Sequence, residues 1–77
     1  MNAVKIGIYR HSKTGKKYRV IGVTKHSETL EDLVIYECLY ANSTSKYWVR
    51  PVAMFTENVE IQGVMVPRFT RVETNVE

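Results

Sequence analysis

The chain has 77 residues, a formal net charge of +3, 44% hydrophobic residues and 25% charged residues, values that indicate one small globular domain rather than a disordered chain. A domain of this length buries only about 60–65% of its unfolded surface, so a large internal cofactor cavity is not expected. The single cysteine, Cys38, excludes an intramolecular disulfide and a cysteine metal cluster, which indicates a reducing compartment. No apolar run has the length of a signal peptide or membrane span, so we expect a cytoplasmic protein without membrane association.

The basic residues are concentrated in the first third of the chain. Residues 1–26 contain seven of them and no acidic residue, whereas residues 27–77 contain eight acidic and four basic residues. Such asymmetry indicates an anionic partner, or internal pairing of a basic hairpin with an acidic one.

Apolar residues alternate with polar ones near the N-terminus, which predicts a strand rather than a helix. The first strand places Ile6 and Ile8 on one face and Tyr9 and His11 on the other. We interpret the face with Tyr9 and His11 as a solvated strand face, with contact to a nucleic-acid strand as the alternative.

The next two strands carry the clearest core pattern. In the second strand, at residues 17–26, the predicted inward residues are Tyr18 and Val20 in the first half and Ile21 and Val23 in the second. The parity switches at Gly22, which predicts a β-bulge or barrel corner there. The third strand, at residues 33–40, is dense in β-branched and aromatic residues. Its inward positions are predicted to be Val34, Tyr36, Cys38 and Tyr40.

The second half of the chain is divided by prolines and a glycine turn. A short strand at residues 47–50 ends at Pro51, and residues 51–57 are predicted to form a short 3₁₀ turn. Gln62 and Gly63 predict a two-residue hairpin turn that pairs residues 59–61 with residues 64–66.

These elements predict an all-β fold. Five to six short strands with a corner glycine, and at most one or two short helical or 3₁₀ turns, are typical of a small closed or half-open β-barrel. We expect residues 1–77 to form this single domain, with residues 72–77 as a frayed tail.

Several segments in this order resemble a family of small, mostly bacterial domains of unknown function with an SH3-like barrel fold. The resemblance spans residues 5–72 and implies the barrel, but no activity, substrate or catalytic residue. The turns at residues 13–17 and 41–47 look extended relative to that family, and the second lacks a glycine. The segments are Gly7–His11, His26–Thr29, Leu39–Tyr40, Trp48–Pro51, Met54–Glu57 and Val66–Phe69.

The first functional hypothesis is a non-catalytic module that binds a protein or peptide. SH3-like barrels bind ligands in aromatic-lined grooves. Trp48 and Arg50 share a strand face; if Tyr47 and Val49 point inward, the indole and guanidinium stand together at the surface and can stack on a ligand. The alternative is a core Trp48 beside an Arg50 whose stem lies along the barrel end. The predicted ligand-binding residues are Tyr9, Trp48, Arg50, Pro51 and Arg68.

The second hypothesis is weak nucleic-acid binding through the basic N-terminal hairpin. Acidic residues packed beside that hairpin would neutralise it. The predicted residues are Arg10, Lys13, Lys16, Lys17, Arg19 and Lys25.

A third and weaker hypothesis is an acid–base enzyme around His26, with Ser27 or Glu28 as its partner. Consecutive loop residues point in different directions, so we favour a turn with hydroxyls that satisfy local backbone amides, and we expect no enzyme. Only two histidines are present and Cys38 is predicted to be an inert buried thiol, so we expect no metal and no cofactor. We expect a monomer, or a homodimer through an open edge strand at residues 47–50.

Overall fold

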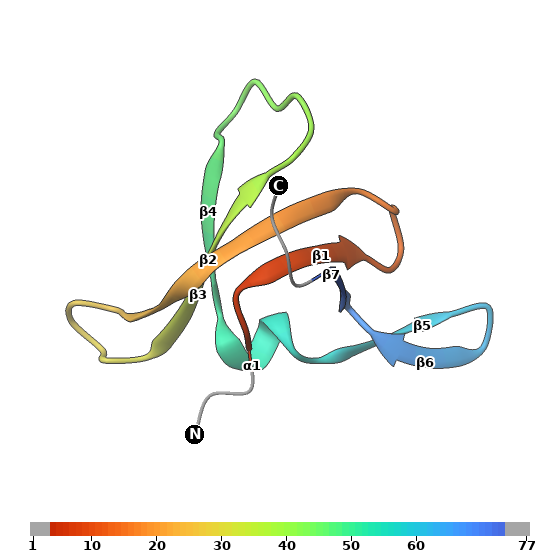
Figure 1. Ribbon diagram of the computed structural model, residues 1–77. Helices are drawn as coiled ribbons and strands as arrows, with labels where there is room; N and C mark the ends of the chain where they lie inside the picture. Colours follow the sequence, from red (N-terminus) through yellow and green to blue (C-terminus); the bar gives the residue numbers. More distant parts are fainter. Residues whose placement is uncertain (1–3, 74–77) are drawn as a thin grey trace.

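The computed structural model describes residues 4–73, which form seven strands and one short helix (Figure 1). The elements are β1 (Gly7–His11), β2 (Lys17–Lys25), β3 (Asp32–Cys38), β4 (Tyr47–Pro51), α1 (Val52–Phe55), β5 (Asn58–Ile61), β6 (Val64–Pro67) and β7 (Phe69–Glu73).

Five strands form one antiparallel sheet in the order β4-β3-β2-β1-β7, and β5 and β6 form a separate hairpin that extends away from it (Figure 1). Within residues 4–73 the edge strands β4 and β7 do not pair with each other, so the barrel is half-open rather than closed. The all-β prediction is confirmed. The strands number seven instead of five or six because β6 and β7 are separate strands on either side of Arg68.

The core is small and rich in aromatic side chains. Phe55, Val20 and Val34 are the largest fully buried side chains. Phe55 stacks on Phe69 with ring centroids 4.2 Å apart, and its ring also meets those of Tyr9 and Tyr36. Full burial of one such ring stabilises the fold by about 1.5–3 kcal/mol.

Helix α1 has only four residues, a length that is not stable by itself. It lies after Pro51, whose fixed φ suits a helix start, and it carries Phe55 into the core. Thr56 closes it by donating its backbone N–H to the carbonyl of Val52 at 3.0 Å. The prediction of one short helical turn is confirmed, as an α-helical turn rather than a 3₁₀ turn.

The β-bulge predicted at Gly22 is present. The pairing of β2 with β3 shifts between Val20 and Gly22, which leaves Ile21 as the extra residue. Val20 is fully buried and Val23 packs against the core, as predicted. The prediction that Ile21 points inward is wrong, because the bulge leaves this side chain 41% exposed.

A second bulge, which the alternation did not reveal, lies in β7. Ile8 of β1 faces Glu73 and Tyr9 faces Arg71, which leaves Val72 as the extra residue. In β1, Ile8 and Tyr9 are both buried, whereas Ile6 is 61% exposed. The interpretation of Tyr9 as part of a solvated face is therefore wrong.

The predicted β5–β6 hairpin is confirmed in register. Val59 pairs with Val66 and Ile61 with Val64. Gln62 and Gly63 have φ values of 52° and 81°, and the two-residue turn that suits twisted strands requires positive φ at both positions.

Strand β7 extends further than predicted. Val72 and Glu73 belong to β7, where Glu73 pairs with Ile8 of β1, so the expectation of a frayed tail from residue 72 is wrong for these two residues. The predicted fraying of residues 74–77 lies outside the described residues. Within residues 4–73, no helix has the length and apolar character needed to cross a membrane.

Candidate functional site

Four aromatic rings, an amide and a guanidinium line a shallow pocket of about 200 Å³ on the inner side of the sheet. Neighbouring strands bring them together, because Tyr18 faces Cys38 across β2 and β3, and Tyr36 faces Trp48 across β3 and β4. We call this the aromatic pocket. Its lining residues are Tyr18, Tyr36, Tyr40, Asn42, Trp48 and Arg50.

The tyrosines of the aromatic pocket hold one another in place. Tyr18 meets Tyr36 and Tyr40 edge to face, with centroids 5.4 and 5.5 Å apart, and each such contact contributes about 0.5–1.5 kcal/mol beyond its buried area. The Tyr18 and Tyr40 hydroxyls share a hydrogen bond of 2.9 Å. Burial, followed by this hydrogen bond, raises the pKa of Tyr18 above its usual value. Tyr18 is therefore a neutral phenol at physiological pH.

The sulfur of Cys38 positions Trp48. The Trp48 indole Nε1 donates a hydrogen bond to Cys38 Sγ at 3.2 Å, and Asn42 Nδ2 donates to the same sulfur at 3.7 Å. Asn42 Oδ1 accepts the backbone N–H groups of Thr44 and Ser45, which folds the loop between β3 and β4 around the pocket. Cys38 is buried as predicted. The sequence pattern did not predict that Cys38 accepts a hydrogen bond from Trp48. The available signal was its position two residues after Tyr36, which places both side chains on the same face of the strand.

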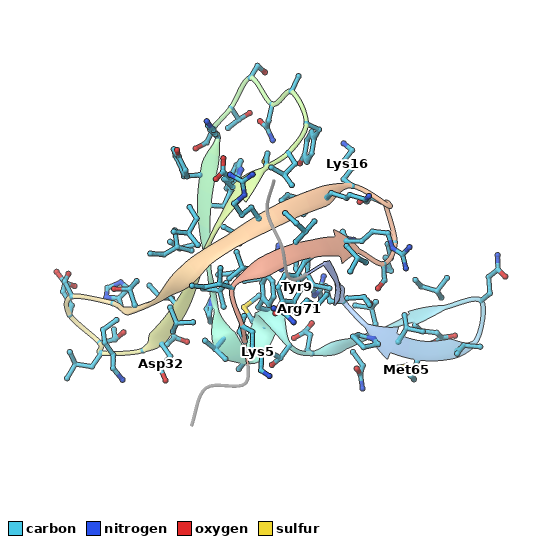
Figure 2. All side chains as sticks on the ribbon, viewed as in Figure 1. Lys5, Tyr9, Lys16, Asp32, Met65 and Arg71 are labelled. Atoms are coloured by element: carbon cyan, nitrogen blue, oxygen red, sulfur yellow. The ribbon has the colours of Figure 1, made fainter. Side chains whose placement is uncertain are left out.

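Arg50 gives the aromatic pocket its charge. Its Nε donates to the Tyr36 hydroxyl at 3.4 Å, and its guanidinium lies 5.7 Å from the centroid of the Phe69 ring. Across residues 4–73, no carboxylate forms an ion pair with Arg50, and no acidic side chain lines the pocket. Lys16 adds a second cation, with Nζ 4.7 Å from the Tyr40 ring centroid; Figure 2 places it at the turn between β1 and β2.

The structure brings two of the predicted ligand-binding residues, Trp48 and Arg50, into this pocket, but in an unexpected orientation. Tyr47 and Val49 are the outward residues of β4, at 54% and 56% exposed, so Trp48 and Arg50 lie on the inner face and are both partly exposed. The premise that Tyr47 and Val49 point inward is therefore wrong. Pro51 ends β4 and is partly buried.

Arg68 does not line the aromatic pocket. It forms an ion pair with Glu57, and its backbone N–H donates to the Glu57 carbonyl at 2.9 Å. Next to it, the ring of His11 meets Phe69 edge to face at 4.9 Å. Burial, and then the charges of Arg68, Arg50 and Lys13, lower the pKa of His11.

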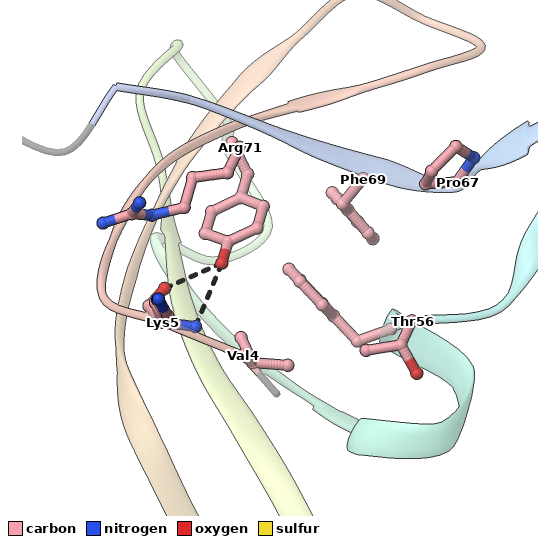
Figure 3. Close-up of a pocket in the computed structure, with 8 residues that line it drawn as sticks. Val4, Lys5, Thr56, Pro67, Phe69 and Arg71 are labelled. Atoms are coloured by element: carbon pink, nitrogen blue, oxygen red, sulfur yellow. Dashed lines mark hydrogen bonds between the residues drawn. The ribbon is translucent and has the colours of Figure 1, made fainter. Parts of the chain in front are cut away.

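Tyr9 lines a second pocket, of about 290 Å³, together with Phe55 and Phe69. Figure 3 shows the lining of this pocket. Its hydroxyl donates to the Lys5 carbonyl at 2.8 Å and accepts the Lys5 backbone N–H at 3.1 Å. Arg71 donates from Nε and Nη2 to the Ile6 carbonyl, at 3.3 and 2.8 Å. We call this the Tyr9 pocket; it is separate from Trp48 and Arg50.

The basic hairpin is neutralised only in part. Arg19 pairs with Glu37 at 3.4 Å and Lys25 pairs with Asp32 at 2.6 Å, so internal pairing accounts for two of the six predicted nucleic-acid-binding residues. In the part of the chain that the structure describes, the other four have no acidic partner. They are Arg10, Lys13, Lys16 and Lys17.

His26 has a structural task in the loop between β2 and β3. Its Nδ1 accepts the backbone N–H groups of Glu28 at 3.1 Å and Thr29 at 3.3 Å. Thr29 Oγ1 in turn accepts the N–H of Glu31 at 3.2 Å. This is the predicted turn. Its backbone N–H groups are accepted by the His26 ring as well as by the Thr29 hydroxyl. Among the described residues, no group of three or more histidine, cysteine, aspartate or glutamate side chains could hold a metal ion.

A half-open barrel of short antiparallel strands with an aromatic pocket on its inner face defines the class of small all-β domains to which the chain belongs. The family model for proteins of unknown function DUF1653 matches residues 7–71, so the chain belongs to the DUF1653 family. This confirms the resemblance seen in the sequence. The chain is also similar to the crystal structure of a DUF1653 protein from Bordetella bronchiseptica, with 31% identity, a TM-score of 0.88, and coverage of 97% of this chain and 95% of that one. The comparison with curated proteins found no match.

Proposed function

We propose that this protein is a non-catalytic module that binds a segment of another protein in the aromatic pocket. The observation that carries the proposal is a pocket lined by four aromatic rings and by Arg50. Within residues 4–73, Arg50 forms no ion pair with an acidic side chain. Recognition of extended peptides by aromatic-lined grooves follows the same physical rule, since ring faces offer rigid apolar contact at low entropic cost.

The size of the pocket favours a peptide over a small-molecule substrate. At about 200 Å³ it falls below the roughly 300–1,000 Å³ of sites that enclose a drug-sized ligand. It has room for one side chain or proline ring while the rest of the ligand lies on the surface. A non-catalytic role agrees with the occupation of His26 Nδ1 by backbone N–H groups in a turn.

Selection from a random peptide library displayed on phage tests this proposal. We expect the wild-type protein to enrich a consensus sequence that Trp48→Ala and Tyr40→Ala no longer bind. Tyr47→Ala is the matched control, because Tyr47 precedes Trp48 on β4 but points outward. A consensus that survives both pocket substitutions, or the absence of any enrichment by a folded protein, contradicts the proposal.

A second candidate function is weak nucleic-acid binding by the unpaired part of the basic hairpin. Its support is that Arg10 and Lys17 are cross-strand neighbours and that Lys16 reaches the rim of the aromatic pocket. Titration of labelled single- and double-stranded oligonucleotides by fluorescence anisotropy tests it, at low and moderate salt. Backbone binding weakens as salt rises, and no binding at low salt excludes this candidate.

The edge strand β4 also supports a proposal of self-association. As predicted, β4 is an edge strand, and an unpaired edge offers N–H and C=O groups to a second copy. Sedimentation equilibrium of the wild type and of Val49→Lys, a charge on the outward face of β4, distinguishes a monomer from a β4-paired dimer.

A further inference from the structure

We infer that the segment bound in the aromatic pocket is acidic: it places one apolar group between the rings and a carboxylate on Arg50. This inference rests on the proposed function and adds the charge of the partner.

The first step concerns the unused hydrogen bonds of Arg50. A guanidinium is a planar fork of N–H donors that matches a carboxylate. Only Nε has a partner, the Tyr36 hydroxyl at 3.4 Å, and no carboxylate of residues 4–73 pairs with this side chain. The neighbouring Arg68, by contrast, has Glu57 as its partner. A carboxylate supplied by a ligand would form with Arg50 the ion pair that Glu57 forms with Arg68.

The second step excludes the cationic ligand that four aromatic rings would otherwise favour. Ring faces attract ammonium and guanidinium groups, but here the protein supplies its own cations. Lys16 Nζ lies 4.7 Å from the Tyr40 ring centroid, and Arg50 lies 5.7 Å from that of Phe69. A lysine or arginine side chain entering the pocket would meet two like charges with no acidic side chain in the lining.

The third step counts the donors that remain in the pocket. Trp48 Nε1 uses its one hydrogen on Cys38 Sγ, and Asn42 Nδ2 uses one of its two on the same sulfur. The Tyr36 hydroxyl accepts from Arg50 Nε and keeps its own hydrogen. The Tyr18 and Tyr40 hydroxyls carry two hydrogens between them and share one hydrogen bond, so one hydrogen of this pair stays available. The pocket therefore keeps several donor hydrogens besides those of Arg50 and has no anionic acceptor in its lining, which favours an acceptor-rich ligand.

The shape of the pocket favours an acidic peptide over a nucleic acid. Single-stranded nucleic acids stack successive bases on exposed ring faces. Here Tyr18 meets Tyr36 and Tyr40 at interplanar angles of 80° and 84°, which builds walls around one small hollow rather than a platform for several bases.

Three small probes with the same ring and different charges test the inference: N-acetylproline (anionic), N-acetylprolinamide (neutral) and prolinamide (cationic). Each is titrated into the ¹⁵N-labelled full chain, with the indole N–H of Trp48 as the reporter. We expect N-acetylproline to shift the Trp48 signal, N-acetylprolinamide to bind about tenfold more weakly, as the loss of one charge-assisted hydrogen bond predicts, and prolinamide to leave the signal unchanged.

Arg50→Gln is the test variant and Lys5→Gln its charge-matched control, because Lys5 lines the separate Tyr9 pocket. We expect Arg50→Gln to lower the affinity for N-acetylproline to that for N-acetylprolinamide, and Lys5→Gln to leave it unchanged. Equal shifts with all three probes leave the pocket as a binding site but overturn the acidic ligand. No Trp48 shift with any probe overturns both the inference and the proposed function. A Trp48 shift with an oligodeoxythymidine, lost in Arg50→Gln and absent with N-acetylproline, overturns the inference in favour of the nucleic-acid candidate.

Discussion

The two pockets of this protein are connected by one continuous set of aromatic rings. They differ in the hydrogen-bond partners of their polar side chains. The rings run from Tyr9 to Phe55, from Phe55 to Phe69, and from Phe69 to Tyr36 and Tyr18. The Tyr9 pocket is the larger, at about 290 Å³ against about 200 Å³.

In the larger pocket, two polar side chains bond to the backbone. The Tyr9 hydroxyl is held by the backbone of Lys5, and Arg71 by the Ile6 carbonyl. In the aromatic pocket, Arg50 donates from Nε to the Tyr36 hydroxyl and has no acidic partner within residues 4–73. The Tyr18 hydroxyl bonds to the hydroxyl of Tyr40. The proposed ligand site is thus the smaller of the two pockets, where Arg50 bonds to a side-chain hydroxyl rather than to the backbone.

The largest effect is expected at the stack of Phe55 on Phe69, which lines the Tyr9 pocket. Phe55→Ala removes a ring that is 2% exposed and stacks on Phe69, and should lower the free energy of unfolding by about 3–5 kcal/mol. Urea denaturation followed by circular dichroism measures this loss. Met54→Ala, at a residue 45% exposed on the same helix, should change it by no more than about 0.5 kcal/mol. Similar losses for both variants would show that the rings do not form a shared core.

The two tyrosines sharpen the comparison directly. Tyr9→Phe removes two hydrogen bonds to the Lys5 backbone and should cost about 1–3 kcal/mol of stability. Tyr18→Phe breaks one hydrogen bond, to Tyr40, at a partly exposed position, and should cost about 1 kcal/mol or less.

Binding should follow the opposite order in these two variants. We expect Tyr18→Phe to weaken the response of Trp48 to N-acetylproline and Tyr9→Phe to preserve it. Urea denaturation and the probe titration together measure both effects. Loss of the response in Tyr9→Phe alone would place the ligand in the Tyr9 pocket.

Cys38 offers a smaller and more local test of the aromatic pocket. Cys38→Ala removes the acceptor of the Trp48 indole N–H, which should cost about 1 kcal/mol and shift the emission of this single tryptophan. Cys38→Ser keeps an acceptor and should retain most of the wild-type emission. Identical spectra for wild type and Cys38→Ala would mean that the sulfur does not orient the indole.

The smallest effect is expected from the pH dependence of stability. Burial, with Arg68, Arg50 and Lys13 beside it, lowers the pKa of His11 from its ordinary 6.5. The unfolded chain then binds a proton before the folded one, so stability falls as the pH drops below 6.5 toward the folded pKa. His11→Gln should remove this part of the slope. Urea midpoints of both proteins across this range measure it, and parallel curves would contradict the assignment.

Local sequence signals predicted the parts of the fold that depend on neighbouring residues. The Gln62–Gly63 turn sets its own register through positive φ, and Gly22 marks its bulge because the alternation of the strand changes parity there. The candidate site was predicted only in part. Trp48 and Arg50 were identified as ligand-binding residues, since they share a strand face. The other four lining residues were not, because residues from three strands and a loop meet only after the sheet forms; they are Tyr18, Tyr36, Tyr40 and Asn42.

The orientation of β4 shows why the missing part could not be predicted. Its alternating pairs, Tyr47 with Val49 and Trp48 with Arg50, each offer one aromatic side chain, so either could face inward. A charged side chain normally indicates that its face of the strand points to solvent. Here the Arg50 guanidinium lies over Phe69 and donates to Tyr36, partners that come from β7 and β3.

By itself the sequence determined an all-β domain of the DUF1653 family, its main strands, its hairpin turn and the bulge at Gly22, because alternation and turn chemistry act over a few residues. Only the tertiary structure decided which rings meet, which cations find an acidic partner, and which face of β4 lines a pocket. These outcomes depend on contacts between distant strands, such as Arg19 with Glu37 and Trp48 with Cys38, and no local pattern encodes them.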